Sequence, residues 1–229
     1  RATSRKSMAK LPKRKLRDSS ATRARILSAA KVEFAQKGLG GARVDDIAAR
    51  SKTNKRMMYH YFGNKDELFR ITLEEAYADI RNAELQLELD KLDPVAALKE
   101  NIAFVWQYYL DNPEFLTLVN SENLHQARHI KKSTRIRELS RPFVGRMQHL
   151  LERGIAAGQF RRDNDAVQLN ITIAAVGYYY LTNRFTGSIV FERDLMTKKA
   201  LAERLAHNTK TILRLVCTPE ALARIEASP

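Results

Sequence analysis

R-V-D-D-I-A-A-R-S-K-T-N-K-R-M-M-Y-H-Y-F-G-N-K-D-E-L occupies residues 43–68 of the chain. Its apolar spacing predicts a short helix over 44–50, and the polar run 51–54 supplies a turn whose last residue can cap the next helix. That next helix is predicted over 55–61. Two short helices joined by a tight turn are the layout of a helix-turn-helix, whose second helix enters a DNA major groove about 12 Å wide.

The second helix is predicted to present cations and aromatic rings together. Met58 and Phe62 stand four residues apart and anchor the helix to the core. A lysine or arginine can pair with guanine, whereas tyrosine and histidine more often bind phosphates. A methionine can touch a thymine methyl group. The outward candidates for DNA contact are Lys55, Arg56, Met57, Tyr59 and His60.

Residues around this helix are candidates for positioning the DNA. Asn54 can act as helix cap or as base reader. Lys65 stands at the start of a further long helix capped by Asn64, where a phosphate contact is favoured. The remaining positioning candidates are Arg43, Val44 through its backbone, and Lys52.

Residues 20–69 resemble the tetracycline-repressor (TetR/AcrR) family of bacterial regulators. The motifs are I-L-S-A-A-K-V-E-F-A-Q-K-G at 26–38, V-D-D-I-A at 44–48 and K-R-M-M-Y-H-Y-F-G-N-K-D-E-L-F at 55–69. Lys52 stands where the family often has glycine. The resemblance implies an all-α fold, with an N-terminal three-helix DNA-binding domain and a larger C-terminal helical domain for ligand binding and dimerisation.

Composition agrees with a helical DNA-binding protein. The 229 residues include only nine glycines and six prolines, and β-rich runs are scarce. Of the net charge of +14, residues 1–70 carry +13, with 19 Lys and Arg against 6 Asp and Glu. Basic charge confined to the helix-turn-helix segment is expected of phosphate neutralisation, although a solvated basic face is the alternative.

Cysteine content and hydropathy point to the cytoplasm. Cys217 is the single cysteine, which excludes an intramolecular disulfide framework. No apolar run approaches the roughly 20 residues that a membrane-spanning helix needs, and no secretory signal is visible. We therefore expect a cytoplasmic protein without a membrane partner.

The chain divides into three predicted parts. Residues 1–17 hold eight Lys and Arg and no acid, and are predicted to form a disordered arm that follows DNA or serves as a solubility tail. Residues 18–64 are predicted to form the DNA-binding domain, with Gly38 ending the first helix. Residues 65–229 are predicted to form the effector-binding and dimerisation domain.

Two late helices are candidates for a dimer interface. The predicted helix over 165–185 is apolar on several faces, and the one over 195–217 is amphipathic. The family resemblance implies that the last two long helices form a four-helix interface in a homodimer. Two-fold symmetry would double the contacts to a pseudo-palindromic operator in double-stranded DNA.

A pocket for a small apolar or aromatic effector is implied by the resemblance. Aromatic residues gather in the second half of the chain, which describes a small-molecule pocket but also any helical core. Amphipathic or polar groups on inward-leaning helices need a partner. The candidate ligand-binding residues are Asn101, Trp106, Asn123, His125, Phe143 and Tyr178.

A metal site is the weaker hypothesis for Glu122, His125 and His129. A predicted helix over 122–130 places the three on one face, as metal ligands would be. The alternative is a hydrogen-bonded polar cluster at a pocket edge. No fourth ligand is evident in the sequence, so neither a metal nor another cofactor is expected.

These sequence features bear on three classes of function. The first is a dimeric repressor released from its operator by a small molecule, with a ligand-independent regulator of the same family, or an activator, as the alternative. The second is an enzyme, for which no phosphate loop, nucleophile elbow or zinc-protease motif is present. The third is an architectural DNA binder, which would leave the near-neutral second domain without a purpose.

Overall fold

The computed structural model describes residues 13–227, with side chains from residue 19 onward. Within this range the chain forms eleven α-helices, two short 3-10 helices and no strand, apart from one isolated antiparallel bridge between Phe160 and Cys217. The all-α prediction is confirmed. The α-helices are α1 (Lys13–Gly41), α2 (Val44–Arg50), α3 (Lys55–Phe62), α4 (Lys65–Leu85), α5 (Pro94–Asp111), α6 (Pro113–Leu124), α7 (Thr134–Ala156), α8 (Ala166–Thr182), α9 (Arg184–Val190), α10 (Lys198–Val216) and α11 (Pro219–Ala227), and the 3-10 helices are η1 (Leu89–Lys91) and η2 (Ile130–Lys132).

The chain separates into two compact units, residues 1–72 and 73–229. In the described part of the first unit, α1 packs against α2 and α2 against α3. The core is aromatic and aliphatic: Phe34 and Phe69 meet edge to face with ring centroids 5.1 Å apart, and both are fully buried. Met58 and Phe62 are buried as predicted.

The first helix is longer than the sequence predicts. It begins at Lys13 instead of Asp18, so residues 13–17 belong to α1 and the predicted disordered arm is wrong for them. The rest of the arm, residues 1–12, lies outside the described residues. Gly38 leaves the helical conformation with φ 66° and ψ 176°, which supports the predicted end of the regular helix.

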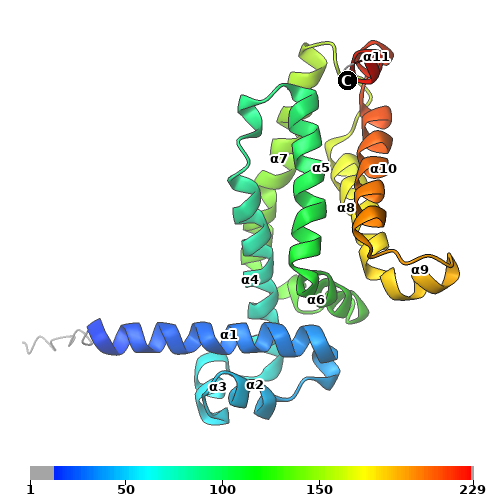
Figure 1. Ribbon diagram of the computed structural model, residues 1–229. Coiled ribbons are helices and arrows are strands. Elements are labelled where there is room, and N and C mark those ends of the chain that lie inside the picture. Colours follow the sequence, from blue (N-terminus) through cyan, green and yellow to red (C-terminus); the bar gives the residue numbers. More distant parts are fainter. Residues whose placement is uncertain (1–12, 228–229) are drawn as a thin grey trace, which may run out of the picture. The chain divides into compact units, whose positions relative to one another are not determined.

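In the second unit α5 runs between two pairs of helices, with α4 and α7 on one side and α8 and α10 on the other (Figure 1). Asp93 caps α5 by accepting from the amide of Val95, and Pro94 starts the helix. The buried stripe Leu98, Ile102 and Val105 then faces the neighbours of α5.

One predicted helix is absent from the structure, and two others have different bounds. The predicted helix over 122–130 does not form, because α6 already contains Glu122 and ends at Leu124. The predicted helix over 165–185 ends at Thr182 and is followed by α9, and the last predicted long helix runs over 198–216. Among the described residues, no helix has the length and apolarity needed to cross a membrane.

Candidate functional site

The turn between α2 and α3 is built without glycine. Lys52 adopts a left-handed conformation with φ 53°. Buried Ser51 stabilises the turn, since its hydroxyl lies 3.1 Å from the Ala48 carbonyl oxygen and 2.7 Å from Thr53 Oγ1. Arg25 of α1 donates from Nε to the Ser51 carbonyl oxygen at 3.3 Å. Side chains therefore hold Lys52 in a conformation that a non-glycine residue rarely adopts.

Asn54 caps α3 as the sequence predicts. Its backbone is extended, and its Oδ1 accepts a hydrogen bond of 2.8 Å from the amide of Met57. With Met58 and Phe62 buried below, the opposite face of the helix is exposed at Lys55, Arg56, Tyr59 and His60, while Met57 is half-buried. The structure thus brings the candidate DNA-contacting side chains of α3 together on the side of the helix opposite its buried anchors.

The remaining predicted DNA contacts differ in their freedom to reach a phosphate. Arg43 and Lys52 are exposed, and Val44 is half-buried at the start of α2. Lys65 donates from Nζ to the carbonyl oxygen of Ala42 at 3.0 Å. Lys55 pairs with the carboxylate of Asp45 at 3.3 Å. To contact DNA, Lys55 would have to break this ion pair, which costs little free energy because the pair is exposed to solvent.

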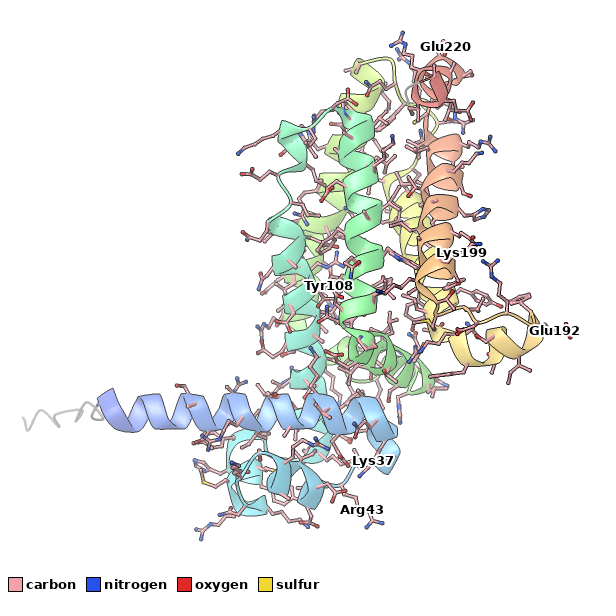
Figure 2. The ribbon with its side chains drawn as sticks, viewed as in Figure 1. Lys37, Arg43, Tyr108, Glu192, Lys199 and Glu220 are labelled. Atoms are coloured by element: carbon pink, nitrogen blue, oxygen red, sulfur yellow. The ribbon has the colours of Figure 1, made fainter. Side chains whose placement is uncertain are left out.

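A charged cluster fixes α2 against α1. The ammonium of Lys37 lies 2.6 Å from Glu33 Oε1 and 2.8 Å from Asp46 Oδ2. The hydrogen bond to Asp46 is the main cause that raises the pKa of Lys37, and it lowers the pKa of Asp46. Lys37 and Arg43 lie at the same end of α1, where the chain turns into α2 (Figure 2).

The second unit contains a cavity of about 370 Å³, lined by α4, α5, α6, α7 and α8. This size lies within the range typical of small-molecule sites. Most of its wall is apolar or aromatic, and Val144, Val167 and Ile171 of the lining are exposed on the outer surface. The full lining is Tyr77, Ile80, Arg81, Glu84, Asn101, Val105, Tyr109, Phe115, Val119, Phe143, Val144, Val167, Asn170, Ile171, Ile173, Ala174 and Tyr178.

Charged and amide side chains occupy one part of this wall. Arg81 stacks over the ring of Phe143, with its guanidinium carbon 3.8 Å from the ring centroid. Burial lowers the pKa of Arg81, and burial raises the pKa of Glu84 to about 7 against the attraction of two arginines, Arg81 and Arg146. Asn101 and Asn170 are each 8% exposed. The cavity thus combines aromatic walls with a region of buried charged and amide side chains.

Three of the six predicted ligand-binding residues line the cavity, namely Asn101, Phe143 and Tyr178. The other three do not. Trp106 is buried against Tyr180, with ring centroids 5.7 Å apart. Asn123 is exposed and donates to the Val119 carbonyl oxygen, and His125 Nδ1 lies 2.7 Å from the Ser121 carbonyl oxygen. Each of these two side chains thus makes a hydrogen bond within its own segment of the chain.

The charged residues of the cavity, Arg81 and Glu84, were not among the candidates predicted from the sequence. Tyr77, Arg81 and Glu84 follow one another at spacings of four and three along α4, and all three line the cavity. That spacing places them on one helical face. A buried charge pair next to an aromatic residue on a mainly apolar helix face is the signal that could have identified them.

Glu122, His125 and His129 form a polar cluster instead of a metal site. His125 and His129 follow the end of α6, so the three do not share a helical face. The buried Glu122 carboxylate accepts from the ring Nδ1 of His129 at 2.6 Å and from the amides of His129 and Ile130 at 2.8 and 2.9 Å. Among the described residues, no three His, Cys, Asp or Glu side chains form a group that could hold a metal ion.

Comparison with known families gives two matches. The family described as bacterial regulatory proteins of the tetR family matches residues 26–71, and the tetracyclin repressor-like C-terminal domain matches residues 94–212. The chain is 42% identical over 193 residues to the HTH-type transcriptional repressor NicS of Pseudomonas putida. The aligned region covers 84% of this chain and 91% of that protein. It is 39% identical to the repressor SCO4008 of Streptomyces coelicolor over 47% of the chain and 53% of that protein.

Solved structures share the fold. A transcriptional regulator from Streptomyces coelicolor, SCO4942, superposes with a TM-score of 0.65 at 23% identity, over 85% of this chain and 98% of that one. A TetR transcriptional regulator from Chloroflexus aurantiacus gives a TM-score of 0.64 at 19% identity, over 88% of this chain and 98% of that one. The similar proteins are named as transcriptional regulators and not as enzymes.

Proposed function

Because the chain belongs to the TetR family of bacterial DNA-binding transcriptional regulators, we propose that it is a homodimeric, cytoplasmic repressor released from its operator by a small-molecule effector. Residues 18–64 read the DNA, and residues 65–229 bind the effector and dimerise. The observation that carries this proposal is the exposed face of α3, where cations and aromatic rings stand above the buried anchors Met58 and Phe62.

In this proposal α3 reads the bases. Lys55 and Arg56 pair with guanine edges, Met57 and Asn54 contact neighbouring bases, and Tyr59 and His60 bind phosphates. Exposure of the four charged and aromatic side chains supports these roles. The positioning contacts come from Arg43, the backbone of Val44, Lys52 and Lys65.

The homodimer is proposed to form through α8 and α10, with α9 beside them. Large apolar side chains lie exposed on these helices, as expected of a surface that a second copy covers. The most exposed of them are Tyr179 at 61%, Phe185 at 71%, Ile189 at 79% and Val190 at 72%. A two-fold dimer would bury this surface and pair two copies of α3 on a pseudo-palindromic operator.

Effector control requires the cavity ligand to bind the released form better than the DNA-bound form. By linkage, operator DNA must then weaken the binding of the ligand by the same factor. The helix α4 follows α3 in the chain and carries four cavity residues, Tyr77, Ile80, Arg81 and Glu84. A shift of α4 on ligand binding is the proposed route of control.

The test is selection of binding sites from random duplex DNA with the full-length protein. We expect a palindromic motif with half-sites about one helical turn apart. Arg56→Ala and Tyr59→Ala should abolish the preference for this motif, whereas Arg141→Ala, which removes an exposed arginine of α7, should leave it intact. Binding that depends on salt alone, without an enriched motif, would refute the repressor.

A further inference from the structure

Four polar groups in the wall of the cavity lack the hydrogen bonds that burial demands. Within the described residues, Arg81 Nε, Arg81 Nη1, Glu84 Oε1 and Asn170 Nδ2 are all buried without a hydrogen-bond partner. Leaving such a group unsatisfied is unfavourable, and more so for a charged group. All three side chains line the cavity. These unsatisfied groups therefore form a binding site for a polar group of a ligand.

The balance of these groups favours an acceptor with negative charge. Three of the four are N–H donors, and two belong to a guanidinium. Glu84 takes little of the donor capacity of Arg81: Arg81 Nη1 lies 2.9 Å from Glu84 Oε2, but in a geometry that forms no hydrogen bond. Arg146 also approaches Glu84 Oε2, at 3.4 Å. Two arginines thus face a single carboxylate, which leaves a net positive charge.

The rest of the cavity favours a flat ring. Phe143 stacks with the Arg81 guanidinium, and Tyr77, Tyr109 and Phe115 lie in the same lining. The Tyr77 and Phe115 rings meet edge to face at 5.5 Å, and Tyr109 stacks on Phe115 at 6.1 Å. Aromatic walls stabilise a planar ligand through offset and edge-to-face contacts.

From this arrangement we infer that the cavity binds a small planar aromatic acid, whose carboxylate accepts hydrogen bonds from Arg81 and Asn170 while its ring lies among the tyrosines and phenylalanines. This inference rests on the proposed function and specifies the chemistry of its effector. An Arg–carboxylate pair is among the strongest charge-assisted hydrogen bonds. A neutral aromatic compound would leave the guanidinium unsatisfied.

Glu84 then becomes the group that couples binding to pH. It faces Arg81 on its own helix, Arg146 on α7, and Tyr108 and Tyr109 on α5. From α8 the cavity receives the amide of Asn170 and the hydroxyl of Tyr178, which donates to Asn120 Oδ1. Tyr108 lies in the C-terminal half of α5 (Figure 2). A ligand carboxylate beside Glu84 favours the protonated form of Glu84, so the protein takes up a proton on binding.

Calorimetric titration of the full-length protein tests the ligand class. The probes are benzoate and 2-naphthoate, their neutral amides benzamide and 2-naphthamide, and the flexible anion octanoate. We expect at least one planar acid to bind about tenfold or more tightly than both its amide and octanoate, as a charge-assisted hydrogen bond provides. Absence of binding by both acids, or equal binding of acid and amide, overturns the inference.

Two variants at the polar wall separate direct recognition from a folding defect. Arg81→Met should abolish the preference for the acid over its amide, and Arg141→Met, at an exposed position of α7, should keep it. Glu84→Gln removes the competing carboxylate, so it should strengthen binding of the acid at pH 8. The unmodified protein should bind the acid more tightly at pH 6 than at pH 8, and this difference should disappear in Glu84→Gln. Weaker acid binding in Glu84→Gln, or an intact preference in folded Arg81→Met, contradicts the inference.

The ligand titrations and the operator selection can fail independently, so their failures are distinguishable. An enriched operator with no binding of either acid leaves the proposed repressor standing and removes this ligand class. If an acid binds but no operator is enriched, the ligand class is supported and the proposed repressor function is not.

Discussion

Asn54 Oδ1 accepts a hydrogen bond of 2.8 Å from the amide of Met57, and this contact fixes the first turn of α3. Asn54→Ala should lower the free energy of unfolding by about 1 kcal/mol, as loss of an N-cap does. Asn54→Asp keeps the cap but adds a negative charge on the exposed side of α3. It should therefore retain stability and weaken binding to the selected operator. Chemical denaturation and DNA titration measure the two effects, and equal DNA affinity in Asn54→Asp would place Asn54 away from the phosphates.

Lys52 holds a left-handed conformation with φ 53° in the turn before α3. Lys52→Gly should raise the free energy of unfolding by up to about 1 kcal/mol, because glycine adopts this conformation without a steric penalty. The control is Ala49→Gly, at an exposed position inside α2, which should lower stability by about 1 kcal/mol. If Lys52 neutralises a phosphate, Lys52→Gly also reduces the salt dependence of DNA binding by about one unit of slope. An unchanged slope would remove Lys52 from the interface.

Much of the helix-turn-helix formed by α2 and α3 could be predicted from the sequence because its signals are local. The bounds of α2 match the prediction, and those of α3 differ by one residue at the end. The cap at Asn54 and the buried pair Met58 and Phe62 follow from spacing within a single helix turn. Such features depend on neighbours along the chain, which the sequence displays directly.

The cavity could not be predicted in the same way because its residues come from five helices. Asn170 meets Glu84 and Phe143 in one wall only after α4, α7 and α8 have packed. Periodicity identifies the buried face of each helix but does not say which faces meet. Trp106 and Phe143 looked equivalent in sequence, yet Trp106 packs on Tyr180 whereas Phe143 stacks with Arg81 in the cavity.

Two glycines of α7 should respond in opposite ways to alanine. A Cβ atom on Gly154 would lie 1.9 Å from Cδ2 of Phe160, whereas one on Gly145 meets nothing within 4 Å. Gly154→Ala should therefore lower the free energy of unfolding by about 1–3 kcal/mol through overpacking. Gly145→Ala should raise it by about 0.5–1 kcal/mol, because alanine favours the helix. Thermal denaturation of both variants measures the difference, and similar effects at the two sites would contradict the packing of Phe160 on α7.

Glu122 is predicted to stabilise the segment after α6 without a metal. Its carboxylate accepts three hydrogen bonds, one from the His129 ring and two from backbone amides. Glu122→Ala should lower the free energy of unfolding by about 2 kcal/mol or more, since it leaves buried donors unsatisfied. Glu138→Ala, an exposed change on α7, is the control and should have a small effect. Added zinc should leave the melting temperature of the unmodified protein unchanged, and a rise that disappears in Glu122→Ala would restore the metal hypothesis.

The stability of the protein should decline with pH through Glu84. Burial raises the pKa of this carboxyl from 4.5 to about 7 in the folded protein. Between these two values the folded state binds more protons than the unfolded state, so the free energy of unfolding falls as the pH rises. Glu84→Gln cannot ionise and lacks this contribution. The difference in unfolding free energy, Glu84→Gln minus the unmodified protein, should therefore increase from pH 4.5 to pH 7 and stay constant above.

Urea denaturation at a series of pH values measures this difference, and Glu138→Gln serves as the control at an exposed position, for which the difference should vary little with pH. Contributions from groups that the variant and the unmodified protein share cancel in this comparison. A difference that decreases with pH would mean that Arg81 and Arg146 stabilise the Glu84 carboxylate by more than burial destabilises it. The carboxylate would then hold both arginines firmly, and the net charge available to an anionic ligand would be smaller.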